Sequence, residues 1–117
     1  MSGLMYPKVP AKKKRKKHKA SILQAHDGTC YLCRKLHDDH RIHAYLERHH
    51  VFGGADRDKS EAEGLTVYLC VAHHREGPEA AHLNQYVNRI LQQDAQTVYE
   101  AQHSHKDFME LIGKNFI

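Results

Sequence analysis

The chain has 117 residues, which is enough for one small domain with one modest core and excludes a multidomain organisation. Hydrophobic residues make up 40% of it and Trp is absent, so a bound metal would supplement a thin core. The formal net charge is +4, and no apolar run approaches the roughly 18 residues that a membrane-spanning helix needs.

The N-terminal stretch MSGLMYPKVP contains no hydrophobic segment of signal-peptide length, so we expect a cytoplasmic protein. Residues 8–19 then hold eight of the 18 Lys and Arg and no acid. The remaining 10 basic and 14 acidic residues give the chain from residue 20 onward a net charge of −4. The basic character of the protein therefore belongs to its first 20 residues and not to the body.

Such a basic run is disordered when free and attracts polyanions. We expect residues 1–20 to form an arm that binds nucleic acid, because each Lys or Arg that neutralises a phosphate releases a counterion. A solvated, solubilising tail is the alternative. The expected phosphate contacts are Lys12, Lys13, Lys14, Arg15, Lys16, Lys17 and Lys19.

The rest of the chain, residues 21–117, is expected to be one domain. Ser21 precedes a short apolar run and is typical of a helix N-cap, and Asp27-Gly28 indicates a turn. The stretch HAYLERHHVF, residues 43–52, alternates apolar and polar residues as a strand does, and LTVYLC, residues 65–70, favours its partner strand. The polar segment between them, residues 53–64, is expected to be a loop.

Two helices are expected after residue 77. Pro78 suits a first helical position, and apolar residues then recur at spacings of three, four and seven, which predicts a long amphipathic helix over residues 78–101. A shorter helix is expected over residues 105–113, ending at Gly113. The apolar stripe of the long helix is expected to pack against the hairpin.

Two short motifs have the spacing of a structural zinc site: Cys30-x-x-Cys33 and Cys70-x-x-His73. Thiolate and imidazole suit tetrahedral zinc, and four protein ligands close its coordination sphere. The alternatives are free cysteines with coincidental spacing and a thioredoxin-like redox pair, and the absence of a βαβ pattern disfavours the latter.

Histidines are unusually frequent, with twelve in the chain, and two pairs of them are adjacent: His49-His50 and His73-His74. If His73 binds zinc, His74 is available for another role. Neighbouring residues on a strand face opposite ways, so only one of each pair can easily share a site. The order strand, loop, strand, histidine can hold one divalent cation between the hairpin and the following helix, with a spare imidazole beside it.

The combination of these motifs, with Gly53-Gly54 after the first histidine pair, resembles the zinc-knuckle branch of the HNH (ββα-metal) nucleases. Within that family it is most similar to the phage recombination-enhancement (Ref-type) proteins, in which a basic arm precedes the knuckle. The resemblance covers roughly residues 7–117. It implies a small zinc-stabilised ββα-metal domain of the α+β class, with a disordered basic arm and C-terminal helices.

The resemblance also implies residue roles and partners. His49 would bind the catalytic cation, Mg²⁺ or Mn²⁺, and His50 would be the general base in phosphodiester hydrolysis of DNA. His74 would be a second ligand of that cation. We add His82 as a candidate third ligand, although its spacing of eight residues from His74 is unusual for the family. A recombinase filament on DNA is the partner that the resemblance suggests.

The middle Asn of the HNH signature has no counterpart, because no Asn lies between His50 and Asn84. A backbone carbonyl or Thr66 would then orient His50, and Asn84 could only replace it from the helix. Two other functions remain open: a non-catalytic zinc-knuckle module that binds DNA, and a zinc-finger-like adaptor for a protein partner. The extra histidine in each pair is needed by neither of them.

The charge distribution generates the first prediction. Deleting residues 1–19 should weaken DNA binding and flatten its salt dependence without unfolding the body, because the remaining chain is acidic. If all eight basic residues contact phosphate, log K should change with log salt by a slope of about −7 on B-DNA. Fluorescence anisotropy over a salt series measures this slope, and equal slopes for both proteins would exclude the arm as the main electrostatic contact.

Overall fold

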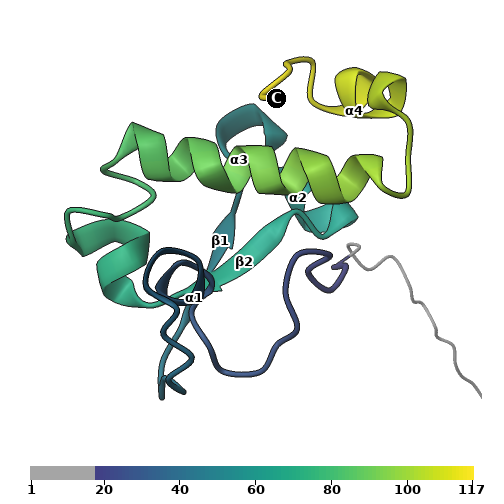
Figure 1. Cartoon of the computed structure of the whole chain (residues 1–117). Coiled ribbons are helices and arrows are strands. Elements are labelled where there is room, and N and C mark those ends of the chain that lie inside the picture. The colour runs from purple at the N-terminus through teal and green to yellow at the C-terminus, as the bar shows by residue number, and fades with distance from the viewer. Residues whose placement is uncertain (1–17) are drawn as a thin grey trace, which may run out of the picture.

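The computed structural model describes residues 18–117, so Lys12 to Lys17 of the predicted arm lie outside the described residues (Figure 1). The described chain is a small α+β domain with one two-stranded antiparallel sheet, as the sequence predicts. No helix in this part of the chain is long and apolar enough to cross a membrane. Its elements are α1 (Tyr31–His37), β1 (Glu47–His50), η2 (Gly54–Asp56), α2 (Arg57–Glu63), β2 (Thr66–Leu69), η3 (Ala72–Glu76), α3 (Gln85–Glu100) and α4 (His105–Leu111).

Both predicted strands are present and pair with each other. Glu47 lies opposite Leu69 and His50 lies opposite Thr66, so the first histidine pair occupies the end of β1 nearest the connection to β2. The prediction of a loop between the strands is wrong, because residues 53–64 contain η2 and α2. Its residues are polar but include good helix formers, and Gly64 ends α2 in the left-handed conformation that a glycine C-cap prefers.

The long helix begins later than predicted. The N-cap of α3 is Asn84, whose side chain accepts hydrogen bonds from the backbone N–H groups of Tyr86 and Val87. Pro78 does not start the helix. The residues before Asn84 form turns. The shorter helix is confirmed as α4, with a capping box between Ser104 and Asp107.

Two local features near the N-terminus differ from expectation. Ser21 caps no helix: its Oγ accepts from the N–H groups of Leu23 and Gln24 and donates to the carbonyl of Thr66, which fastens this segment to β2. The Asp27-Gly28 turn leads into α1, a helix that the sequence pattern did not predict, with Cys30 as its N-cap. The first cysteine pair therefore lies at the start of a helix.

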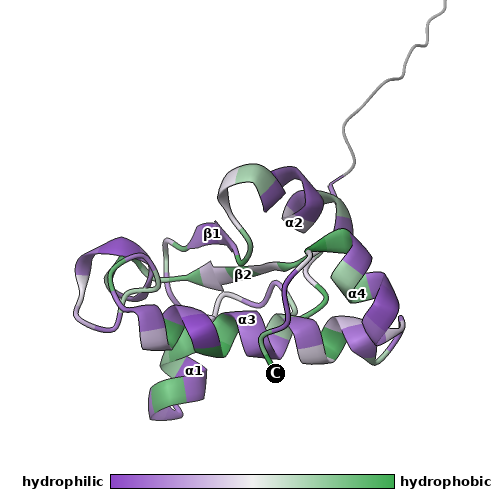
Figure 2. Ribbon diagram, turned by 90° about the horizontal axis from the view of Figure 1, so that it is seen from above, coloured by the Kyte–Doolittle hydropathy of each residue, from purple (hydrophilic) through white to green (hydrophobic). Residues whose placement is uncertain are grey.

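The core forms where the hairpin meets α3. Alternate residues of the β2 segment, Leu65, Val67 and Leu69, are fully buried. The buried face of α3 contributes Val87, Leu91, Ala95 and Tyr99 at intervals of four residues, which is the helical packing period. Seen from above, the hairpin runs between α2 and α3 (Figure 2). This arrangement fixes β1, which carries His49 and His50, against the rest of the domain.

Gly64 provides a test of this packing. Its φ is +74°, and a Cβ at this position would collide with the carbonyl oxygen of Ala20. Gly64→Ala should therefore destabilise the domain by at least the roughly 1–2 kcal/mol that a left-handed conformation costs a non-glycine residue. Gly53→Ala is the matched control, because a Cβ there meets nothing within 4 Å. Chemical denaturation of both variants would contradict the prediction if their midpoints were equal.

Candidate metal centres

The four predicted zinc ligands converge on one point. Nδ1 of His73 lies 3.7 Å from Sγ of Cys30, 3.3 Å from Sγ of Cys33 and 3.4 Å from Sγ of Cys70, and the last two sulfurs are 3.9 Å apart. Ligands on tetrahedral zinc, at bond lengths of about 2.3 Å to sulfur and 2.0–2.1 Å to nitrogen, are separated by about 3.8 Å (S to S) and 3.6 Å (S to N). The cluster can therefore hold a metal ion such as zinc.

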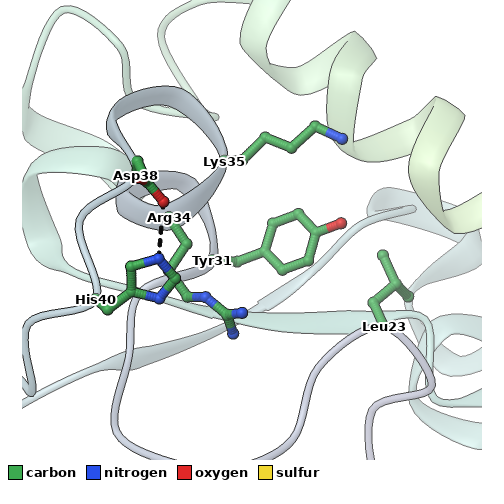
Figure 3. Close-up of a pocket in the computed structure, with 6 residues that line it drawn as sticks. All are labelled: Leu23, Tyr31, Arg34, Lys35, Asp38 and His40. Atoms are coloured by element: carbon green, nitrogen blue, oxygen red, sulfur yellow. Dashed lines mark hydrogen bonds and ion pairs between the residues drawn. The ribbon is translucent and has the colours of Figure 1, made fainter.

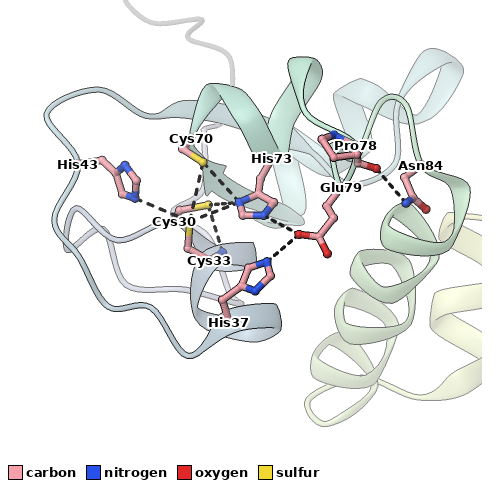
Figure 4. A network of polar contacts seen from close by, with 9 residues as sticks. All are labelled: Cys30, Cys33, His37, His43, Cys70, His73, Pro78, Glu79 and Asn84. Atoms are coloured by element: carbon pink, nitrogen blue, oxygen red, sulfur yellow. Dashed lines mark hydrogen bonds and ion pairs between the residues drawn. The ribbon is translucent and has the colours of Figure 1, made fainter.

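The elements position these ligands from two sides. Cys30 and Cys33 lie at the start of α1, while Cys70 follows β2 and His73 lies in the π-helical turn η3 (Figure 4). Burial raises the pKa of the Cys30 and Cys33 thiols, so a positive ion is needed to favour their thiolates. Since all four ligand atoms come from protein, this centre is closed to substrate, as structural zinc sites are.

A carboxylate supports the histidine of this cluster. Oε1 of Glu79 lies 3.5 Å from Nε2 of His73 and 2.6 Å from Nε2 of His37 (Figure 4). With Nδ1 of His73 facing the sulfurs, its Nε2 faces Glu79 at the range of an ion pair. Such carboxylate–histidine pairs orient metal ligands and raise their basicity.

A second cluster joins three histidines from separate segments: His49 on β1, His74 in η3 and His82 in the turn before α3. One ring nitrogen from each lies within 4.8 Å of the others. The Nε2 atoms of His74 and His82 are 3.1 Å apart. Two nitrogens bound to one ion at about 2.1 Å are separated by about 3.0–3.4 Å, so both rings can bind the same cation.

Backbone pairing explains the unusual spacing between His74 and His82. The N–H of Ala81 donates to the carbonyl of His73, and the N–H of His82 donates to the carbonyl of His74. The chain therefore folds back at Gly77 and Pro78 and places residue 82 beside residue 74. The predicted helix over residues 78–101 included His82, but His82 lies in the turn that precedes α3.

His74 is held by a carboxylate, as His73 is. Its Nδ1 lies 2.7 Å from Oε1 of Glu47, and the guanidinium of Arg75 donates to both oxygens of the same carboxylate. Hydrogen bonds from Arg75 and His74 lower the pKa of Glu47 to about 2. An ionised carboxylate only accepts, so Nδ1 of His74 is the donor and its Nε2 presents a lone pair to the cluster.

His49 is the buried member of this cluster. Its side chain is 5% exposed, and within residues 18–117 its Nε2 has no hydrogen-bond partner. Burial, together with the charges of the neighbouring histidines, lowers the pKa of His49 to about 3. His49 is therefore a neutral imidazole with an unsatisfied nitrogen, and a buried polar atom without a partner costs about 1–3 kcal/mol. A bound cation would remove that cost.

The two clusters differ in access. The Cys/His cluster is largely buried, while the three-histidine cluster runs from buried His49 to exposed His82. Three protein ligands leave coordination positions for water or substrate, which is the arrangement of a catalytic metal site. His82 also has a pKa lowered by burial and by the adjacent His74, which favours its neutral, ligating form.

His50 lies outside the three-histidine cluster. Its Nε2 is 2.6 Å from Oε1 of Glu61 on α2. Neither residue suggested from sequence makes this contact: Oγ1 of Thr66 has no hydrogen-bond partner in the described chain, and Asn84 caps α3. Sequence reasoning missed Glu61 because its segment was expected to be a loop. Recognising a helix between the strands would have placed an acidic residue near β1.

A separate cavity of about 350 Å³ lies against α1 and contains none of the ligands of either cluster (Figure 3). Its polar groups are largely paired with one another or with Asp94. Lys35 lies 2.9 Å from Asp94, the hydroxyl of Tyr31 donates to the same carboxylate, and His40 contacts Asp38. We therefore place the candidate functional site at the Cys/His cluster and the three-histidine cluster.

Comparison of the chain with protein-family models, with curated proteins and with solved structures gave no match.

The Cys/His cluster generates a stability prediction. Purified protein should contain one zinc in this centre, and His73→Ala or Cys70→Ser should lower zinc content and unfold the domain. Structural zinc contributes about 10–16 kcal/mol in small modules, which is comparable with the whole stability of a native domain, about 5–15 kcal/mol. Elemental analysis and thermal melting measure both effects. His40→Ala is the control, since within residues 18–117 this exposed ring hydrogen-bonds only Asp38 and lies outside the four-ligand set. A zinc-free wild type with a cooperative melt would contradict the prediction.

Proposed function

We propose that this protein is a metal-dependent endonuclease of the HNH type that hydrolyses DNA phosphodiester bonds. Zinc at Cys30, Cys33, Cys70 and His73 would be structural. His49, His74 and His82 would hold a second, catalytic cation. The observation that carries the proposal is the unpartnered Nε2 of buried His49 beside two further imidazoles, one of them fixed by Glu47. Neither a DNA-binding module nor an adaptor requires this arrangement.

The donor set favours certain cations. Imidazole ligands suit transition ions such as Zn²⁺ and Ni²⁺, whereas Mg²⁺ prefers oxygen ligands. The described cluster offers three imidazoles, and Glu47 contacts His74 from outside it. Of the two cations expected from the resemblance, Mn²⁺ accepts nitrogen ligands more readily than Mg²⁺. We therefore rank a transition ion above Mg²⁺ as the catalytic cation.

Each residue would have a distinct task in the reaction. A cation bound by the three histidines would supply charge stabilisation for the scissile phosphate and the leaving oxygen. His49, His74 and His82 would hold it, and His82 is the exposed member, on whose side a phosphate would approach. His50, the next residue on β1, takes a proton from the attacking water, which is worth about 10²–10⁴ in rate. The basic arm binds the DNA backbone, so recognition is mainly of phosphate.

Target selection would then depend on DNA structure or on a partner. The sequence contains no evident major-groove recognition helix, and the family resemblance points to DNA coated by a recombinase filament. Supplying such DNA alongside naked DNA in the same assay would test this partner directly.

The proposal predicts different failures for neighbouring histidines. With the full-length protein and supercoiled plasmid, wild type should nick DNA in the presence of Mn²⁺, Ni²⁺, Zn²⁺ or Mg²⁺. His74→Ala should keep its zinc and its melting temperature but lose cleavage, because only the open site loses a ligand. His50→Ala should still bind the second cation and lose about 10²–10⁴ in rate. His40→Ala is the control, since this exposed ring contacts only Asp38.

Metal stoichiometry, melting temperature and nicking rate would be measured on proteins purified in parallel. Wild-type nicking rates in both His74→Ala and His50→Ala would refute the nuclease function. DNA binding without metal-dependent nicking would favour the zinc-knuckle binding module instead.

A further inference from the structure

One carboxylate on α2 joins the candidate base to the start of the described chain. Oε1 of Glu61 lies 2.6 Å from Nε2 of His50, and its Oε2 lies 2.5 Å from Nδ1 of His18. The guanidinium of Arg48 approaches the same carboxylate at 3.5 Å. The His50 side chain is 11% exposed and that of Glu61 is 20% exposed, so the pair is shielded from water on most sides.

The direction of the proton in this pair follows from charge. Hydrogen bonds from His18 and His50 lower the pKa of Glu61 to about 2, so it is a carboxylate at neutral pH. A carboxylate only accepts hydrogen bonds, so Nε2 of His50 is the donor. A neutral His50 then carries its lone pair on Nδ1, which is the form that a general base needs.

We propose that Glu61 is the positioning residue of His50 and takes the place of the Asn that the HNH signature lacks here. This inference rests on the proposed nuclease function. Glu61 fixes the ring orientation of His50 and stabilises the imidazolium that forms when His50 accepts a proton. Glu61 acts through His50 and does not itself contact the substrate.

The surroundings of the pair suit this role. A cavity of about 190 Å³ is lined by His18, His50, Arg57, Asp58 and Glu61, which is room for several waters at about 30 Å³ each. Arg57 forms no ion pair within residues 18–117, so its charge is available to a phosphate beside the base. Water can therefore reach the ring that Glu61 holds, and Arg57 supplies a positive charge beside it.

Glu61 could instead be purely structural, because it also helps to fasten the chain before Ser21. That attachment has further contacts, however: the N–H of Lys19 donates to the backbone carbonyl of residue 61, and Arg48 donates to the carbonyl of Lys19. Removing the Glu61 side chain leaves these bonds intact. Glu61→Ala should therefore fold, and its effect on the rate can be separated from any effect on stability.

The test compares Glu61→Ala and Glu61→Gln with Glu63→Ala in the full-length protein. Glu63 lies on the same helix and carries the same charge, but it forms no hydrogen bond or ion pair with His50. Glu61→Ala should lower kcat for plasmid nicking by about 10–100-fold, as loss of an orienting partner does. Its KM, zinc content and second-cation affinity should stay within about twofold of wild type. Glu61→Gln keeps an oxygen acceptor and should lose less, while Glu63→Ala should match wild type.

A second measurement does not depend on cleavage. The ring N–H of His50 should give a downfield, slowly exchanging proton signal in wild type, assigned by its loss in His50→Ala, and the signal should also be lost in Glu61→Ala. Wild-type kcat in both folded Glu61 variants, or a rise in KM alone, would overturn the inference while leaving the nuclease function standing. If wild type does not cleave DNA, the nuclease function fails, and the base-positioning role fails with it. If the proton signal persists in Glu61→Ala, His50 does not donate a hydrogen bond to Glu61, and this result is independent of cleavage.

Discussion

The convergence of three cysteine sulfurs and one imidazole on a single point is the constraint on which the rest of this domain depends. Cys30 and Cys33 come from the start of α1, and Cys70 and His73 come from the end of β2 and the turn after it. The hairpin has only four residues in each strand, and a two-stranded hairpin alone is marginally stable in water. A metal at this point would join the hairpin to α1, and the apolar face of α3 covers the hairpin.

The three-histidine cluster inherits its geometry from that closure. His74 directly follows His73 of the Cys/His cluster, and His49 on β1 packs against the ring of His74. Carboxylates play the same part at both centres, with Glu79 beside His73 and Glu47 beside His74. The domain thus places two candidate metal centres on neighbouring residues while keeping one closed and the other open on one side.

The sequence predicted the parts of the molecule that depend on local chemistry. Ligand spacing identified the Cys/His cluster, and the doubled histidines indicated a second site. Alternation identified the first strand, and β-branched and aromatic residues identified the second. Features set by tertiary contacts were harder to predict. Ser21 was expected to cap a helix because its hydroxyl can do so, but the hydroxyl bonds Thr66 on a distant strand instead. The spacing of His82 depends on a backbone pairing that no side-chain pattern records. Glu61 lay in a polar segment without apolar periodicity, so neither its helix nor its contact with His50 was visible.

The π-helical turn η3 has a consequence for how the two candidate centres depend on each other. The N–H groups of His73 and His74 both donate to the carbonyl of Cys70, and the N–H of Gly77 donates to the carbonyl of Ala72. This wide turn directs the two neighbouring imidazoles to different centres, and the carbonyls of the same two residues hold Ala81 and His82 in place. With His73 bound to zinc, the turn is fixed and His74 is pre-organised beside His82. Without a metal in the Cys/His cluster the turn would be free to move. Binding of a cation to the three histidines would then be weakened by the entropy cost of ordering their three segments. A filled Cys/His cluster would therefore pre-organise the three-histidine cluster, and oxidation of its thiols would loosen both.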